Sequence, residues 1–105
     1  MKILFDQGTP VPLRSHLTGH QIETAAVRGW SELSNGDLLN QAESEGFEAM
    51  VTTDQNLHYQ QNLSSRTIAI LVLTSTSWPR IQSKVSEVKA AVDSLQPGDY
   101  VEVRI

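Results

Sequence analysis

Two aspartates each follow a short apolar stretch of the sequence. Asp6 comes directly after residues 2–5, and Asp54 comes directly after residues 49–53, where two threonines close the apolar run. Such stretches are typical of buried β-strands, and ligands of parallel α/β sheets bind at the carboxyl ends of the strands. The sequence therefore predicts two carboxylates at the same edge of a sheet.

A third aspartate is expected close to the other two. Asp37 lies in the first turn of a predicted helix, and helices that connect parallel strands begin at that same edge. Three clustered carboxylates repel one another unless a cation neutralises them. Carboxylates with water molecules suit Mg²⁺ or Mn²⁺, and such an ion activates water and stabilises a phosphodiester oxygen. We therefore expect a metal site formed by Asp6, Asp37 and Asp54.

Each aspartate also has a purely structural interpretation. Ser34 and Asp37 match a capping box at the start of the helix. Asp54 is suited to cap the polar segment 55–62, and Asp6 is suited to an ordinary turn. The prediction of a functional site depends on the three aspartates together, since local structure explains each of them alone.

Strands and helices alternate along the whole chain. Strands are expected at residues 2–5, 21–24, 48–52, 67–73 and 100–105. Helices are expected at residues 10–19 with Thr9 as the cap, from Ser34 to Gly46, at 55–62 as a short helix or turn, and at 78–95 with Ser77 as the cap, whereas 25–35 is mostly loop. This alternation predicts an α/β fold, a three-layer α/β/α sandwich with a mainly parallel sheet. Residues 100–105 alternate strictly between apolar Val101, Val103 and Ile105 and the more polar positions between them. A strand with one buried and one exposed face belongs at an edge of the sheet.

Length and composition limit the class of protein. A chain of 105 residues with 39 % hydrophobic residues fits one globular domain, residues 1–105. The chain has no cysteine, so a disulfide framework is excluded, and no apolar run approaches the roughly 18 residues of a membrane helix. The first residues do not resemble a signal peptide, and we expect a cytoplasmic protein without a membrane partner.

The net charge is also informative about partners. The formal net charge is −4 at pH 7, which argues against a constitutive nucleic-acid binder with a basic surface. An enzyme that meets nucleic acid through a bound metal ion is still compatible with this charge, because the ion reverses the local sign of an acidic cleft.

Three segments together resemble a known family. Residues 4–7 (LFDQ), 33–37 (LSNGD, before a helix with Ala42) and 51–57 (VTTDQNL) are similar in order and spacing to the compact PIN-like proteins. These are the short DUF5615 or Mut7-C-type relatives of the VapC toxins. The resemblance implies a small α/β/α sandwich that holds Mg²⁺ or Mn²⁺ for cleavage of RNA phosphodiesters, and it implies an antitoxin protein as a partner.

The resemblance also assigns residues. The metal-site and catalytic positions are Asp6, Asp37 and Asp54, and the supporting positions are Thr53, Asn56 and Ser34. The chain differs from the common pattern in two places. Asn56 stands where a second acid commonly follows in the third motif, and Gln7 stands where glutamate or asparagine often follows the first aspartate.

Three functions follow as expectations. The first is a metal-dependent ribonuclease of the toxin–antitoxin type. The second is an interaction module that has the same fold and little or no catalytic activity. Asn56 supports this expectation, because it stands where a second acid is common. The third is a phosphoacceptor domain similar to response-regulator receivers, with Asp54 as the acceptor and Thr74 after the fourth strand. That third match lacks a second acid at Gln7 and a lysine after the last strand. The strand at 100–105 also offers an edge for a homodimer.

Overall fold

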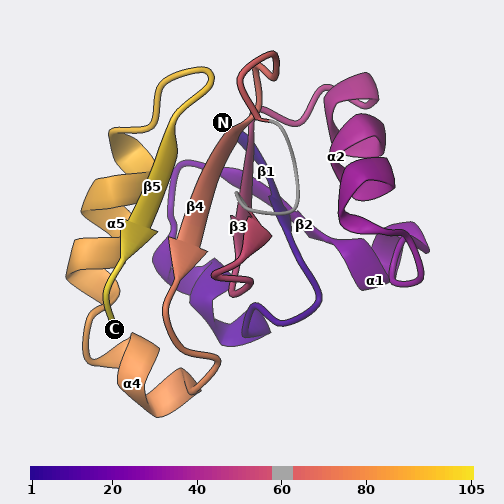
Figure 1. Ribbon diagram of the computed structural model, residues 1–105. Coiled ribbons are helices and arrows are strands. Elements are labelled where there is room, and N and C mark those ends of the chain that lie inside the picture. The colour runs from indigo at the N-terminus through magenta and orange to yellow at the C-terminus, as the bar shows by residue number, and fades with distance from the viewer. Residues whose placement is uncertain (58–62) are drawn as a thin grey trace.

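The computed structural model of the chain, which describes residues 1–57 and 63–105, contains one five-stranded sheet (Figure 1). The strands are β1 (Lys2–Phe5), β2 (Gln21–Thr24), β3 (Ala49–Thr52), β4 (Ala69–Leu73) and β5 (Tyr100–Val103). All four neighbouring pairs are parallel, and the order is β2-β1-β3-β4-β5. The predicted α/β class is therefore confirmed, and the sheet is parallel throughout the described residues.

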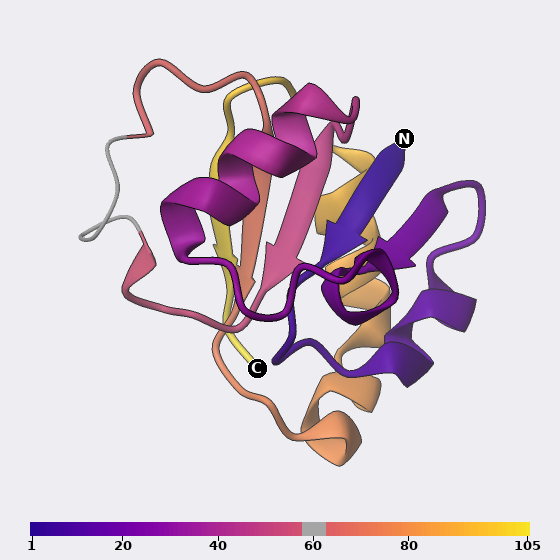
Figure 2. The ribbon, with the colours of Figure 1, turned by 90° about the vertical axis from the view of Figure 1, so that its right-hand side faces the viewer.

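Helices cover both faces of this sheet, as Figure 2 shows from the side. They are the 3-10 helix η1 (Val11–His16) and the α-helices α1 (Ala25–Arg28), α2 (Asn35–Ser44), α4 (Trp78–Gln82) and α5 (Val85–Asp93). Side chains of η1, α4 and α5 pack in the core on one face, and side chains of α1 and α2 pack in the core on the other. The result is the predicted three-layer sandwich.

The two faces of each strand supply the two cores. In β1, Ile3 and Phe5 belong to the core under α5, whereas Leu4 belongs to the core under α2. Strands β3 and β4 are buried along their whole length, because they have a neighbouring strand on each side and helices above and below. Continuous apolar runs predict such central strands.

The predicted C-terminal helix is in fact two helices. The backbone changes direction at Ser83 and Lys84, between α4 and α5, where the N–H of Lys84 donates to the carbonyl of Ile81, three residues earlier. Residue Lys84 has φ −116° and ψ 14°, which are not helical values. The apolar residues from Ile81 to Leu95, spaced by three or four positions as in one continuous helix, nevertheless face the core, where Ile81 and Val88 are both fully buried.

The structure differs from the expectation in two further details of the helices. Residues 25–28 form α1 instead of loop, because the Thr24 side chain caps the helix by accepting from the N–H of Val27. Thr9 does not cap η1, whose N-cap is Pro10, since the Thr9 hydroxyl donates instead to the carbonyl of Val51. The predicted short helix or turn at 55–62 lies partly outside the described residues.

Strands β2 and β5 form the two edges of the sheet, so the predicted position of the C-terminal strand is confirmed. In the described ranges, none of the helices is long and apolar enough to cross a membrane.

Candidate functional site

The sheet has one position where its winding direction changes. Strand β1 lies between β2 and β3, so the chain leaves β1 toward one edge and later returns on its other side at β3. Ligands of open α/β sheets bind at such a switch point, outside the carboxyl ends of the strands. Asp6 follows β1 and Asp54 lies two residues after β3. Both predicted acids therefore lie at this place.

The loop after β1 is fixed to β3 by its first residue. The N–H of Asp6 donates to the carbonyl of Val51 at 2.9 Å, which extends the pairing of the two strands by one residue. The carboxylate Oδ1 of Asp6 accepts from the N–H of Gln7 at 2.7 Å, and its Oδ2 accepts from the hydroxyl of Thr52 at 2.8 Å. These bonds set the orientation of the Asp6 carboxylate.

Thr52 connects the two acidic loops. Its hydroxyl donates to Asp6 and accepts from the N–H of Asp54 at 3.1 Å. The side chain is completely buried at the end of β3. The sequence interpretation did not assign a role to Thr52, although a hydroxyl residue that closes an apolar strand two positions before an acid was the available signal.

The carboxylate of Asp54 is held by two asparagines. Its Oδ1 accepts from the N–H of Asn56 at 2.9 Å, so Asp54 does begin a turn, as the structural interpretation expects. Its Oδ2 accepts from the side-chain amide of Asn35 at 3.0 Å. Asn35 is the first residue of α2, and its contact shows that this helix begins beside the carboxyl end of β3. The sequence interpretation missed Asn35.

Asp37 has a different environment from the other two acids. Its N–H is bonded to the hydroxyl of Ser34, which is the N-cap of α2, as predicted. The residue is exposed and lines an open hollow of about 360 Å³ on α2 with Leu33 and Asn40. Within residues 1–57 and 63–105, no group of three histidines, aspartates or glutamates is arranged to hold a metal ion. The structure thus brings Asp6 and Asp54 together and leaves Asp37 outside their hydrogen-bond network.

The turn after β1 approaches the turn after β3 closely. A Cβ on Gly8 would overlap the hydroxyl oxygen of Thr53, so any other residue at this position would force the Thr53 side chain to move. The N–H of Thr9 closes the turn on the carbonyl of Asp6 at 3.0 Å. Thr53 therefore has a packing role at the site, whereas Asn56 is exposed and contacts Asp54 through its backbone.

Within the described residues, the charges of the two central acids are not compensated by a basic side chain. In the described part of the chain, neither Asp6 nor Asp54 takes part in an ion pair. Within residues 1–57 and 63–105, each carboxylate oxygen accepts one hydrogen bond, and an oxygen with one such bond has a second acceptor position. Hard oxygen donors with free acceptor capacity fit Mg²⁺ or Mn²⁺, which commonly bind to one or two carboxylates and complete their coordination with water or phosphate oxygens.

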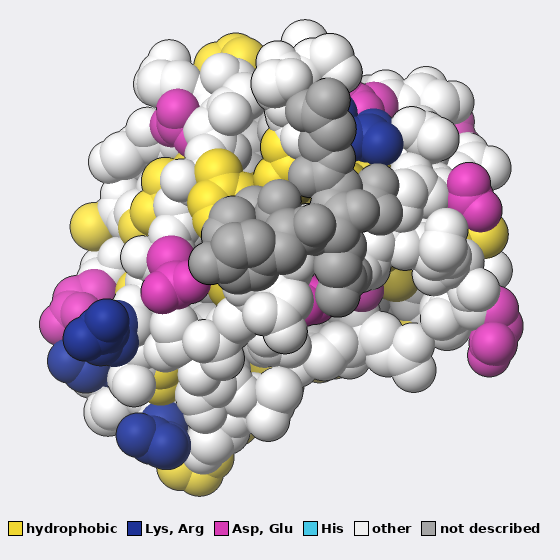
Figure 3. Space-filling model, viewed as in Figure 1, with side chains coloured by type: hydrophobic (Ala, Val, Ile, Leu, Met, Phe, Trp, Pro, Cys, Tyr) yellow, Lys and Arg dark blue, Asp and Glu magenta, His cyan; other side chains and the backbone are white. Residues whose placement is uncertain are grey.

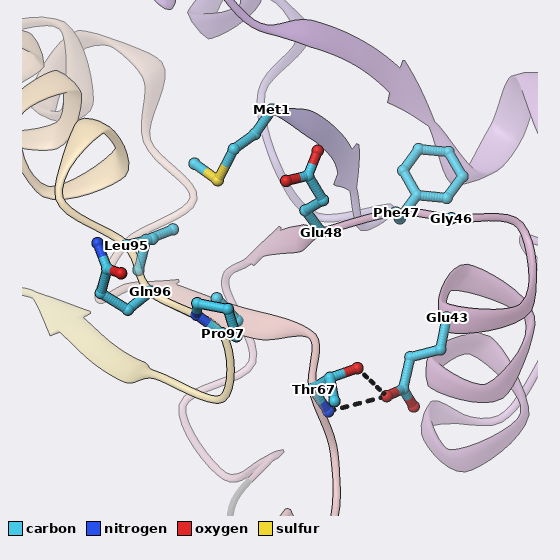
Figure 4. Close-up of a pocket in the computed structure, with 10 residues that line it drawn as sticks. Met1, Glu43, Gly46, Phe47, Glu48, Thr67, Leu95, Gln96 and Pro97 are labelled. Carbon is cyan, nitrogen blue, oxygen red and sulfur yellow. Dashed lines mark hydrogen bonds between the residues drawn. The ribbon is translucent and has the colours of Figure 1, made fainter.

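A second hollow lies at the opposite, amino-terminal edge of the sheet (Figure 4). It encloses about 400 Å³, and its lining includes Met1, Glu48, Leu95 and Pro97. Its glutamates are already engaged: Glu48 accepts from the N–H of Lys2, and Glu43 accepts from Arg66 and Thr67. This hollow is separate from the two aspartates and adds nothing to their chemistry.

No protein-family model, curated protein or solved structure matches the chain significantly. The resemblance to PIN-like proteins therefore stays a prediction from the three motifs.

Proposed function

We propose that the chain is a metal-dependent phosphodiesterase that cleaves RNA and uses Asp6 and Asp54 to hold Mg²⁺ or Mn²⁺. One observation carries the proposal: two acids that form no ion pair among the described residues, joined by the Thr52 hydroxyl, lie at the switch point of a parallel sheet. The choice of RNA, of an antitoxin protein as a partner and of the cytoplasm as location follows from the resemblance to PIN-like proteins.

Each residue has a defined part in this proposal. Asp6 and Asp54 bind the ion, Thr52 orients the first carboxylate and Asn35 orients the second. The bound ion supplies an activated water and neutralises charge on the phosphodiester. Groups that orient metal ligands commonly contribute a factor of about 10 to 100 in metal affinity or activity. The resemblance to PIN-like proteins adds Asp37 as a third metal-site residue, and it adds Ser34, Thr53 and Asn56 as supporting residues.

The direct test is cleavage of RNA in the presence of Mn²⁺ or Mg²⁺. We expect metal-dependent cleavage by the unmodified chain and its loss in Asp6→Asn and Asp54→Asn. Asp99→Asn is a matched control, because it makes the same chemical change at the amino-terminal ends of the strands, away from the site. There the Asp99 carboxylate accepts a hydrogen bond from the N–H of Gln96. Equal cleavage by all variants, or none by the unmodified chain with either ion, would reject the proposal.

Asp37 distinguishes a site of two acids from a site of three. Since its carboxylate lies outside the network of Asp6 and Asp54, Asp37→Asn is expected to reduce cleavage less than Asp54→Asn does. A loss as complete as that of Asp54→Asn would show that the first turn of α2 joins the site when metal and substrate bind.

A second candidate is an interaction module without catalysis. Two observations favour it: the described residues hold no three-acid group, and Asn56 replaces the expected acid. A titration with Mn²⁺ separates the two candidates, because an ion that binds the folded state stabilises it by about 2.7 kcal/mol at a hundredfold excess over the dissociation constant. A melting temperature that does not respond to Mn²⁺ would favour the module.

The phosphoacceptor alternative draws support from the fold alone. The order β2-β1-β3-β4-β5 is shared with receiver domains, and Thr74 follows β4 as that function requires. However, the second acid is missing at Gln7, no lysine follows β5, and the Thr74 hydroxyl accepts from the N–H of Ile105. Absence of covalent labelling of Asp54 by a small phosphodonor would dismiss this alternative.

A further inference from the structure

Within the described residues, strand β5 has no neighbouring strand on one side of its backbone. The carbonyls of Asp99 and Val103 accept from β4 and its extension, and the N–H of Ile105 donates to the side chain of Thr74 on the same side. Backbone groups alternate along an extended chain, so Glu102 in β5 and Arg104, which follows β5 between the inward-directed Val103 and Ile105, direct their N–H and C=O groups away from the sheet. These two residues therefore provide the hydrogen-bonding groups of the free edge.

The side chains along this edge form a pattern that complements itself. Residues 101–105 read Val-Glu-Val-Arg-Ile, an acid and a base placed symmetrically about Val103. If a second copy approaches in the antiparallel direction with the two Val103 residues opposite each other, Glu102 faces Arg104 of the other copy, and Arg104 faces its Glu102. Val101 then faces Ile105.

The backbone supports the same register. In an antiparallel pair, residues whose polar backbone groups point outward must face one another to form hydrogen bonds. With Val103 at the centre, the outward-directed Glu102 and Arg104 face each other, as hydrogen bonding requires. A shift by two residues would place Glu102 opposite Glu102, and like charges directly opposite are destabilising. Charge and backbone direction thus favour the register centred on Val103, which alone places Glu102 opposite Arg104.

We propose that β5 pairs with β5 of a second copy of this chain in that register, so that two sheets join into one across a two-fold axis. Both charged side chains are exposed, and in the described residues neither forms an ion pair within the chain. On the side of the molecule formed by β5, α4 and α5, acidic and basic side chains lie next to one another and do not form a patch of one sign (Figure 3). The proposal does not depend on the metal site.

The other edge does not have these properties. Strand β2 carries a single charged residue, Glu23, and its carboxylate is bonded to Arg28 at 2.8 Å. The sequence of β2 offers no base opposite that acid in an antiparallel copy. Charged residues on edge strands can also prevent association. If the protein is a monomer at all concentrations, Glu102 and Arg104 have that protective role instead.

The experiment is sedimentation velocity in a chelating buffer, from about 10 µM to about 1 mM protein, since a short paired edge is expected to associate weakly. The unmodified chain is expected to approach twice its mass of 11.6 kDa. Glu102→Arg and Arg104→Glu each place like charges opposite one another, and we expect each to weaken association at least about tenfold. Circular dichroism and thermal melting confirm that both variants fold.

A mixture of the two variants gives the most specific result. Glu102→Arg has two bases on the edge and Arg104→Glu has two acids, so the mixed pair restores both attractions and is expected to dimerise. Arg80→Glu on α4, an exposed position outside the edge, is the matched control and is expected to dimerise like the unmodified chain. A chain that stays at 11.6 kDa throughout, or a dimer unaffected by either charge reversal, would overturn the proposal.

Discussion

The hydroxyl of Thr52 fixes the relative position of the two loops that carry the candidate ligands. It donates to the carboxylate of Asp6 and accepts from the backbone of Asp54, and the residue is fully buried from bulk solvent. A valine at this position would fill nearly the same space but would remove both hydrogen bonds. The site therefore depends on a residue that has no charge of its own.

Thr52→Val is expected to destabilise the fold by about 1–3 kcal/mol, because it leaves the Asp54 N–H without its partner. The free energy of unfolding in urea measures this change. Thr76→Val, at an exposed loop position, is the control and is expected to alter it by less than about 0.5 kcal/mol. Equal stability of the two variants would show that the Thr52 hydroxyl does not hold the loops.

The contact between Gly8 and Thr53 gives a second prediction at this scale. Gly8→Ala places a Cβ against the Thr53 hydroxyl oxygen and is expected to cost about 1–3 kcal/mol, since a closely packed neighbour must move. Thr53→Ala removes that oxygen. In the double variant the cost of alanine at residue 8 is expected to fall markedly, and a double-mutant cycle in urea measures this coupling. Additive effects would contradict the close approach of the two turns.

Single residues of the site were predictable only where charge or motif marked them. Asp6 and Asp54 follow apolar strands, so the sequence places them correctly at one edge. Asn35 was not identified, because an uncharged residue at a helix start is explained by the helix alone, and its bond to Asp54 joins residues 19 positions apart. The separation of Asp37 from Asp54 depends on how α2 is turned, which no local pattern specifies.

At the scale of elements, the start of α2 is the link between the helical layer and the site. The Ser34 side chain accepts from the N–H of Asp37 and thereby stabilises the turn that contains Asn35. Buried Leu38 and Leu39 then hold the helix against the sheet. The position of Asn35 beside Asp54 follows from both the cap and the packing.

Ser34→Ala is expected to destabilise the chain by about 1 kcal/mol, and Ser34→Asp is expected to retain most of the stability because aspartate also caps helices. Chemical denaturation measures both. Ser44→Ala, at an exposed position at the end of the same helix, makes the same change without removing a cap and is expected to be nearly neutral. A loss in Ser44→Ala as large as that in Ser34→Ala would argue against the capping role.

The strands were easier to predict than the helices. The predicted ends of all five strands lie within two residues of the observed ends, since apolar runs bounded by polar turns are a strong local signal. The break at Ser83 was missed because the apolar stripe continues across it from Ile81 to Val85. Helix α1 was missed although Thr24 and Gly29 provide a cap and a left-handed end, because the segment between them has only four residues.

At the scale of the whole molecule, several carboxylates tie distant parts of the chain together. Glu43 on α2 binds Arg66 at 2.6 Å and the N–H of Thr67, before β4. Burial alone would raise the pKa of Glu43, but these hydrogen bonds outweigh burial and lower the pKa below its ordinary 4.5. Hydrogen bonds from His20 and Lys89 likewise lower the pKa of Asp93 below 3.8.

Stability is therefore expected to fall in acid. A carboxyl group whose pKa is lower in the folded state stabilises the fold fully above its unfolded pKa and loses that contribution as the pH falls through the folded value. For Glu43 the loss begins near pH 4.5 and continues below it. Urea denaturation between pH values of about 7 and about 3 measures the effect. Glu43→Gln is expected to reduce this pH dependence, and an unchanged dependence would contradict the role of the Glu43–Arg66 pair.

The most direct test of the central claim, that Asp6 and Asp54 hold a divalent cation, is calorimetric titration of the folded chain with Mn²⁺. The unmodified chain and Asp99→Asn are expected to bind the ion with the same affinity, while Asp6→Asn and Asp54→Asn are each expected to lose at least about tenfold. Binding of Mn²⁺ with equal affinity by all four proteins, or no binding by the unmodified chain, would contradict the claim.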